Sequence, residues 1–331
     1  MTRILSLVLV LLSSIAAAQT LPSSEGDLAL TPVVQGLEFP WAFGFLPDGQ
    51  IIITERGGRI YLADPATGAR TELPGGPEAK VAGQGGLLDV LVPRDFAASR
   101  ELFFTYSKEQ ERWRGAGTAL ARAELSPEGD RLTGLRDLYV IAAGSTGGRH
   151  FGSRILEGED GSLYFTVGDR GDRPSAQDLE RENGSVLRVN RDGSIPEDNP
   201  FVGQGAAKGA IWSYGHRNAQ GAAWGLDGAL WTVEHGARGG DEVNRVEPGR
   251  RNYGWPIISY GVHYIGTKIG EGAAKPGLEQ PNFYWDPSIA PSGMMVYSGK
   301  LWPAWRGHIF VGSLKFSMIS RLEGTEQLTE A

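Results

Sequence analysis

Residues 150–169 read HFGSRILEGEDGSLYFTVGD, and this unit decides the fold because it recurs along the chain. It consists of an apolar strand, an Asp-Gly turn and a second strand rich in β-branched and aromatic residues. Further copies, two clear and two weaker, lie at residues 41–64, 218–236, 87–107 and 293–313. Antiparallel units repeated in this way predict an all-β fold, a β-propeller. A β-sandwich is the alternative, but regular spacing over the whole chain favours a ring.

The length of 331 residues permits either two domains or one large all-β domain. Repeats along the whole chain favour a single propeller domain over residues 19–331. Before it, Arg3, an apolar run over residues 4–12 and three alanines ending at Ala18 are typical of a secretory signal peptide, residues 1–18. The run is too short to span a bilayer, and no later stretch approaches roughly 20 apolar residues. We therefore expect a periplasmic or secreted protein without a membrane span.

Composition excludes several classes of function. The chain has no cysteine, which rules out disulfides, thiolate metal sites and cysteine nucleophiles. Its formal charge of −7 argues against sequence-independent binding to nucleic acid, because phosphates require a basic face. The 48 glycines and 19 prolines, without a collagen period, indicate many tight turns between short strands.

Two ionisable residues stand at the ends of the 150–169 unit. His150 precedes the first strand, and histidine is the natural general base near neutral pH. Asp169 ends the strand that pairs back on it, so the hairpin would return the carboxylate toward the imidazole and fix its tautomer. A solvated loop histidine and a turn-forming aspartate are the alternative interpretations.

Three other segments offer ligand contacts. Arg217 and Asn218 lie between two glycines and supply a guanidinium for negative charge and an amide that donates and accepts; a surface turn is the alternative. Gln84 lies in GQGG, where the glycines either admit a flat ligand or only make a turn. The glycine-rich run around Asp241 and Glu242 offers oxygen ligands that suit calcium, with neither a zinc pattern nor EF-hand spacing.

The chain resembles the soluble, pyrroloquinoline quinone (PQQ)-dependent aldose sugar dehydrogenases, relatives of the soluble glucose dehydrogenases. The resemblance extends from about residue 37 to residue 315 through GQGGLLDV, HFGSR, FTVGDRG, GSVLRVNRDGSIPEDNPF, IWSYGHRNAQG, EHGARGGDEVN, NYGWP and APSG. It implies a six-bladed propeller with PQQ over the central axis. Family members continue past the position of Ala331 with an arginine-bearing strand and an Asp-Gly hairpin, so the last blade is expected to be incomplete in this chain.

The resemblance also implies roles for individual residues. His150 is expected to take the proton from the anomeric hydroxyl as hydride passes to PQQ, Asp169 to tune that base, and Arg217 to steady charge on the quinone. Cofactor contacts are implied for Gln84, Arg217, Asn218 and Lys315. Calcium ligands are implied at the quinone from the carbonyls of Gly236 and Ala237, and in a separate structural site from Glu242 and Tyr253.

The sequence therefore predicts a PQQ- and calcium-dependent oxidoreductase. It would oxidise the anomeric carbon of aldose sugars to lactones and pass the electrons to an external acceptor, as a monomer or homodimer. Two alternatives remain open. One is a calcium-dependent propeller lactonase or other hydrolase that uses a metal-bound water and no quinone, and the other is a non-catalytic sugar-binding propeller.

Overall fold

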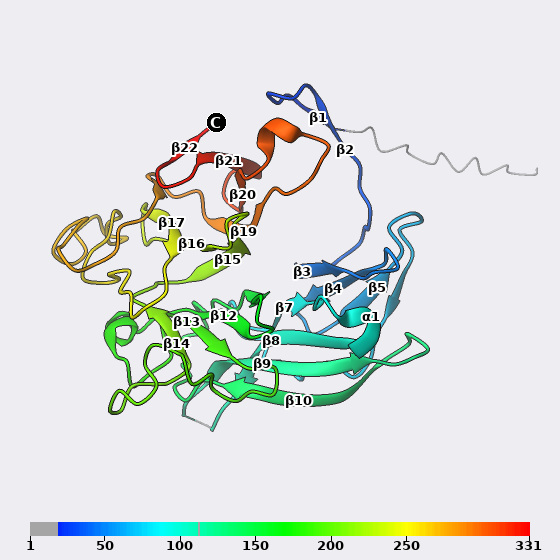
Figure 1. Ribbon diagram of the computed structural model, residues 1–331, viewed down its shortest axis with the longest axis horizontal. Helices are drawn as coiled ribbons and strands as arrows, with labels where there is room; N and C mark the ends of the chain where they lie inside the picture. The colour runs from blue at the N-terminus through cyan, green and yellow to red at the C-terminus, as the bar shows by residue number, and fades with distance from the viewer. Residues whose placement is uncertain (1–18, 112) are drawn as a thin grey trace, which may run out of the picture.

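Five four-stranded antiparallel sheets surround a central axis in the computed structural model, which describes residues 19–111 and 113–331 (Figure 1). Within each sheet the strands are neighbours in chain order. The first strands of successive sheets pack against one another, β3 on β7, β7 on β11, β11 on β15 and β15 on β19. This arrangement confirms the predicted all-β propeller.

The first sheet contains β3 (Pro40–Phe45), β4 (Ile51–Glu55), β5 (Ile60–Ala63) and β6 (Arg70–Glu72). The second contains β7 (Leu87–Leu91), β8 (Glu101–Glu109), β9 (Ala116–Leu125) and β10 (Leu132–Val140). The third contains β11 (Ile155–Glu157), β12 (Leu163–Val167), β13 (Ser185–Val189) and β14 (Ile211–Tyr214). The fourth contains β15 (Ala219–Trp224), β16 (Leu230–Glu234), β17 (Asp241–Val246) and β18 (Phe283–Trp285). The fifth contains β19 (Pro291–Val296), β20 (Ile309–Ser313), β21 (Met318–Gly324) and β22 (Leu328–Glu330).

The remaining elements are short. A hairpin of β1 (Gln19–Leu21) and β2 (Leu28–Leu30) precedes the sheets, and the helices are α1 (Phe96–Ser99), η1 (Arg173–Gln177) and η2 (Pro303–Trp305). None of the helices among the described residues is long and apolar enough to cross a membrane. The predicted signal peptide, residues 1–18, lies outside the described residues.

The predicted six blades with an incomplete last one are not what the structure contains. Its described residues form five blades, and the fifth has all four strands, with β22 paired to β21 over Leu322↔Glu330 to Gly324↔Leu328. Each of the five repeats found in the sequence covers the first two strands of one blade, and the repeat at residues 41–64 also covers the third. Only the family resemblance predicted a sixth blade. Residues 314–331 contain two strands, β21 and β22, which complete the fifth blade.

A threonine in the second strand joins each of the first three blades to the next. The hydroxyl of Thr54 donates to the carbonyl of Leu88 at 2.6 Å, that of Thr105 to Ser153 at 2.6 Å, and that of Thr166 to Ala219 at 3.0 Å. All three side chains are buried. Because a buried hydroxyl without a partner is costly, these bonds favour the observed alignment of neighbouring blades.

In β16 the position equivalent to Thr54 is Val233, and the preceding residue, Thr232, has a buried hydroxyl with no hydrogen-bond partner among the described residues. Thr166 and Thr232 therefore offer a bonded and an unbonded buried threonine for comparison. Thr166→Val removes a donor to Ala219 and an acceptor for the Arg154 N–H, so we expect it to lower the free energy of unfolding by about 1–3 kcal/mol. Thr232→Val should be neutral or stabilising. Denaturant titration of both variants checks this, and equal losses would show that the bonds between blades contribute nothing.

The ring has an uncovered side between the first and fifth sheets (Figure 1). A cavity of about 660 Å³ lies there, with walls from β3, including Phe43, and from β19, including Met294 and Met295. The side chains of Phe43 and Phe45 are 61% and 67% exposed. No described segment covers this apolar face, whereas the first strands of the other blades lie between two neighbours.

Candidate functional site

The predicted site residues lie in loops at one edge of the sheets. Gln84 precedes β7, His150 precedes β11, and Arg217 and Asn218 precede β15. A loop that follows the second strand of a blade reaches the same edge, because paired strands in these sheets are antiparallel. Asp169, after β12, and His235, after β16, enter the site in this way.

These loops enclose a cavity of about 280 Å³. It is lined by Gln84, His150, Arg217 and Asn218, together with Gln220, His235, Tyr264, Leu314, Trp41, Arg56, Leu88, Phe151 and Gly152. Four residues proposed from three separate segments of the sequence therefore meet in one cavity. His150 and Arg217 in particular lie on the same face of the ring, as the prediction requires.

A short hydrogen bond joins His150 to Asp169. The imidazole Nδ1 is 2.6 Å from Asp169 Oδ1, and the carboxylate also accepts the N–H of Gly171 at 2.7 Å and the indole N–H of Trp255 at 2.9 Å. Asp169 is fully buried, while 13% of the His150 side chain is exposed. Since the carboxylate accepts from Nδ1–H, Nε2 is the ring nitrogen left to act as an acceptor in the cavity.

The surroundings favour a charged aspartate and a neutral histidine. Burial lowers the pKa of His150, and the positive charge of Arg217 lowers it further, against the opposing effect of Asp169. Burial acts to raise the pKa of Asp169, but its bonds with His150, Gly171 and Trp255 outweigh burial and hold that pKa below its ordinary value. This protonation state gives the cavity an unprotonated imidazole at neutral pH.

We expect His150 to titrate below its ordinary pKa of 6.5. Its neutral form should thus dominate at pH 7 and be lost only as the pH falls through the lowered value. Any activity that needs the neutral ring should be constant above pH 6.5 and decline on the acid side. Histidine-ring ¹⁵N NMR against pH, with assignment by His150→Gln, measures this directly. A His150 pKa above 6.5 would contradict the assigned protonation state.

The loop that carries His150 is held in an uncommon conformation. His150 has a φ of +55°, which belongs to the left-handed region. Its N–H donates to Gln84 Oε1 at 2.6 Å, and the N–H of Gly152 donates to Asn218 Oδ1 at 3.1 Å. At Gly168 any Cβ atom would collide with the carbonyl oxygen of His150, so only glycine permits this approach. The amide oxygens of Gln84 and Asn218 thus position the loop.

Arg217 brings an unpaired positive charge to the cavity. Its side chain is buried, its Nη1 donates to the carbonyl of His235 at 3.1 Å, and the guanidinium lies 5.4 Å from the centre of the Trp255 ring. No carboxylate among the described residues forms an ion pair with it, and its buried Nε has no partner. A buried cation without a counter-charge indicates a site suited to an anionic or electron-rich ligand.

Lys315 does not line the His150 cavity. It lies beside an adjoining cavity of about 790 Å³, which shares His235 and Tyr264 with the first. Its Nζ donates to the carbonyl of Ser288 at 3.1 Å. Gly236 and Ala237, the predicted ligands of a calcium ion, also line this second cavity. The predicted cofactor contacts therefore divide between two neighbouring cavities.

The residues predicted for a structural calcium site lie behind the first cavity. Glu242 and Tyr253, with Glu234, line a space of about 10 Å³, which is room for a single small species. Burial and the charge of Glu234, its cross-strand partner, raise the pKa of Glu242. Such a carboxylate pair suits a cation, although the Tyr253 hydroxyl donates instead to the Arg245 carbonyl at 2.7 Å. Across residues 19–111 and 113–331 no three His, Asp or Glu side chains cluster as a metal site.

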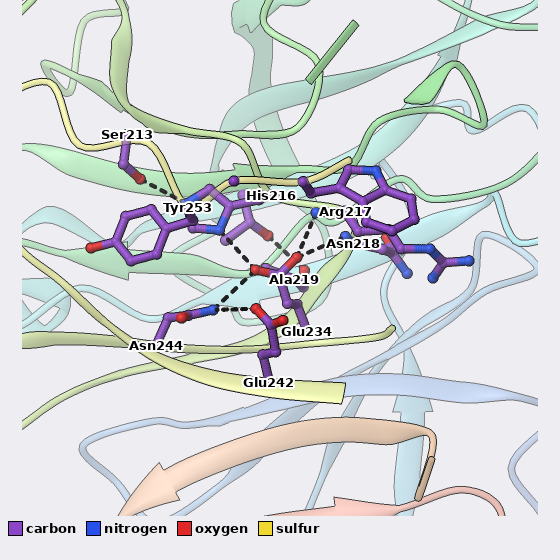
Figure 2. A network of polar contacts seen from close by, with 12 residues as sticks. Ser213, His216, Arg217, Asn218, Ala219, Glu234, Glu242, Asn244 and Tyr253 are labelled. Atoms are coloured by element: carbon purple, nitrogen blue, oxygen red, sulfur yellow. Dashed lines mark hydrogen bonds and ion pairs between the residues drawn. The ribbon is translucent and has the colours of Figure 1, made fainter. Parts of the chain in front are cut away.

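Sequence reasoning missed a buried network behind Arg217 (Figure 2). Glu234 Oε2 accepts the N–H of Arg217 at 2.5 Å and that of Asn218 at 3.3 Å, and Oε1 lies 2.9 Å from His216 Nδ1. His216 Nε2 in turn lies 2.9 Å from Ser213 Oγ. Ser213 is buried and lines none of the cavities described above, so this set is no hydrolytic triad. Its geometry instead fixes the backbone that carries Arg217 and Asn218.

Known proteins resemble this chain in sequence and in fold. Residues 37–331 match the Glucose / Sorbosone dehydrogenase family. The chain belongs to that family. Aldose sugar dehydrogenase YliI of Escherichia coli (strain K12) is 42% identical over 285 residues, covering 84% of this chain and 76% of the relative.

Solved structures of the glucose/sorbosone dehydrogenase family superpose on the chain. The apo-form of the soluble aldose sugar dehydrogenase from Escherichia coli gives a TM-score of 0.87 at 39% identity, covering 90% of this chain and 87% of that one. The PQQ-bound form of aldose sugar dehydrogenase from Streptomyces coelicolor gives 0.75 at 27% identity, covering 91% and 84%.

Proposed function

We propose that this family member is a PQQ-dependent aldose sugar dehydrogenase that oxidises the anomeric carbon of its substrate to a lactone. The observation that carries the proposal is the joint presence of His150 Nε2 and the unpaired guanidinium of Arg217 in one cavity. Support also comes from the PQQ-bound relative in Streptomyces coelicolor, whose fold this chain shares. The signal peptide predicted for residues 1–18 supports a periplasmic or secreted location as part of this proposal.

The residues present fit such a cofactor. PQQ carries carboxylates and a quinone, and the buried Nε of Arg217 lacks a partner. Arg217 would hold the quinone side, Lys315 a carboxylate in the adjoining cavity, and Gln84 and Asn218 further polar contacts. The carbonyls of Gly236 and Ala237 would hold calcium beside it, with a second, structural calcium at Glu242 and Tyr253. Bound PQQ supplies the carbonyl group that accepts the hydride.

The chain's own residues handle the proton and the charge. The Nε2 atom of His150 accepts the proton of the anomeric hydroxyl, and the resulting imidazolium is stabilised by the buried Asp169 carboxylate. Asp169 keeps the Nδ1 proton in place, so Nε2 enters the reaction unprotonated. Arg217 offsets negative charge that develops near it, because no carboxylate among the described residues forms an ion pair with the guanidinium.

Reconstitution separates this function from its alternatives. The purified chain with calcium and PQQ should reduce an electron-accepting dye when an aldose is added, and omission of PQQ should abolish the signal. A propeller lactonase would instead cleave lactones without PQQ and reduce no dye. A non-catalytic sugar-binding protein would show heat of sugar binding by calorimetry, unchanged by His150→Ala, and no turnover under either condition.

A further inference from the structure

The largest fully buried side chain of the described residues belongs to a cation, Arg170. It is 1% exposed and follows directly after Asp169. No carboxylate in the described chain forms an ion pair with it, and its Nε has no hydrogen-bond partner. Burial lowers the pKa of Arg170 to about 9, so the side chain is still a cation at neutral pH. Burying a charge without an ion pair is costly, which calls for an explanation at this position.

The contacts of Arg170 converge on the loop that carries His150. The guanidinium stacks on the ring of Phe151, 3.3 Å from the ring centre, and its Nη1 donates to the carbonyl of Arg149. Its Nη2 donates to the carbonyl of Ala116, at the start of β9, at 3.0 Å. The residues directly before and after His150 are thus both held by one side chain, which is anchored on the neighbouring blade.

This loop needs such support because His150 has a left-handed backbone. A non-glycine residue in that region is unfavourable unless its surroundings enforce it. Gln84 holds the N–H of His150 and Asp169 holds its ring, but neither fixes the carbonyl of Arg149 or the Phe151 ring. Only a planar guanidinium can stack on the ring and donate in two in-plane directions at once; a lysine offers one point charge.

We propose that Arg170 is a positioning residue that fixes the imidazole of His150 against Asp169 with Nε2 in the cavity. The inference rests on the proposed function for its effect on catalysis. In this proposal Asp169 holds the ring of His150, and Arg170 holds the residues on either side of it, Arg149 and Phe151.

Three variants test this in the PQQ- and calcium-loaded protein. Arg170→Met removes both hydrogen bonds and the positive charge. Arg170→Lys keeps the charge but lacks the planar guanidinium that donates in two directions. Arg188→Met is the matched control, since Arg188 is also buried and lies over the aromatic rings of Tyr164 and Trp212 but pairs with Asp160 and Asp198, away from the cavity.

Arg170→Met should lower kcat for aldose oxidation at least tenfold while the KM for sugar stays within twofold. Arg170→Lys should fall between wild type and Arg170→Met. Arg188→Met should lose thermal stability but keep its kcat. If Arg170→Met unfolds, the kcat of Arg170→Lys is compared with that of Arg188→Met. A lower kcat in Arg170→Lys supports the proposal, and an equal kcat overturns it.

A second measurement needs no turnover. The proton between His150 Nδ1 and Asp169 should give a low-field ¹H resonance that is protected from solvent exchange in the wild type. We expect it to broaden or vanish in Arg170→Met and to persist in Arg188→Met. Unchanged resonance and kcat, with a stability loss like that of Arg188→Met, would reduce Arg170 to a structural residue. If the wild type oxidised no aldose, the proposed function would fail while the resonance still decided the role of Arg170.

Discussion

Replacing His150 with alanine is expected to lower kcat for aldose oxidation by about 10²–10⁴-fold, the usual contribution of a positioned general base. The reason is that Nε2 of His150 is the acceptor left in the cavity once Asp169 has bound Nδ1. Uptake of PQQ should persist, because Arg217 and Lys315 are untouched. Dye-linked rates at saturating sugar measure the loss, and the absorbance of added PQQ measures the binding.

His308→Ala provides the control for this experiment. His308 lies in the fifth blade next to Arg321 and lines none of the cavities around His150, so its loss should leave kcat unchanged. Turnover in His150→Ala close to that of His308→Ala would remove His150 from the mechanism.

Asp169→Asn should produce a loss of similar order, about 10²–10⁴-fold in kcat, with little change in side-chain volume. The carboxylate accepts from His150, Gly171 and Trp255 at once, whereas an amide brings a donor into that set. A donor facing Nδ1 favours the tautomer with the proton on Nε2, which cannot act as a base. The pH–rate profile and kcat of the reconstituted variant are the measurements.

The pH dependence of Asp169→Asn has a definite sign. Asp169 raises the pKa of His150, so its removal should lower that pKa and move the acid limb of activity to lower pH.

Asp169→Asn should also be less stable than the wild type at neutral pH. The pKa of Asp169 in the folded protein is lower than the ordinary 3.8, so its negative charge stabilises the fold above pH 3.8. That stabilisation is lost only as the pH falls through the lowered pKa. Trp255→Phe, which removes one of the three bonds, should have smaller effects. An unchanged kcat in Asp169→Asn would exclude a tautomer-setting role.

Much of this organisation could be predicted from local sequence. An Asp-Gly turn between two β-rich segments fixes an antiparallel pair, so the return of Asp169 toward His150 follows from the hairpin itself. The convergence of His150 and Arg217 follows from the repeat, because equivalent loops of successive blades meet at one edge of the ring.

The other features of the site could not be predicted, because they depend on contacts between distant segments, and such contacts leave no pattern in the local sequence. Glu234 and Arg170 lie in or next to buried strands, and their importance appears only when the loops they hold are seen. The resemblance implies that Lys315 contacts the cofactor, but Lys315 lines the adjoining cavity, which shares His235 and Tyr264 with the His150 cavity. The number of blades likewise needed strand pairing, since β21 and β22 have no Asp-Gly turn between them.

Anaerobic addition of an aldose to the PQQ- and calcium-loaded protein tests most directly whether this cavity performs the oxidation. Without any external acceptor, the absorbance of the bound quinone should change to that of its reduced form within one turnover, and the change should be at least 10²-fold slower in His150→Ala. Quinone that stays oxidised in the wild type at saturating sugar, or that is reduced equally fast in His150→Ala, would contradict the proposed chemistry.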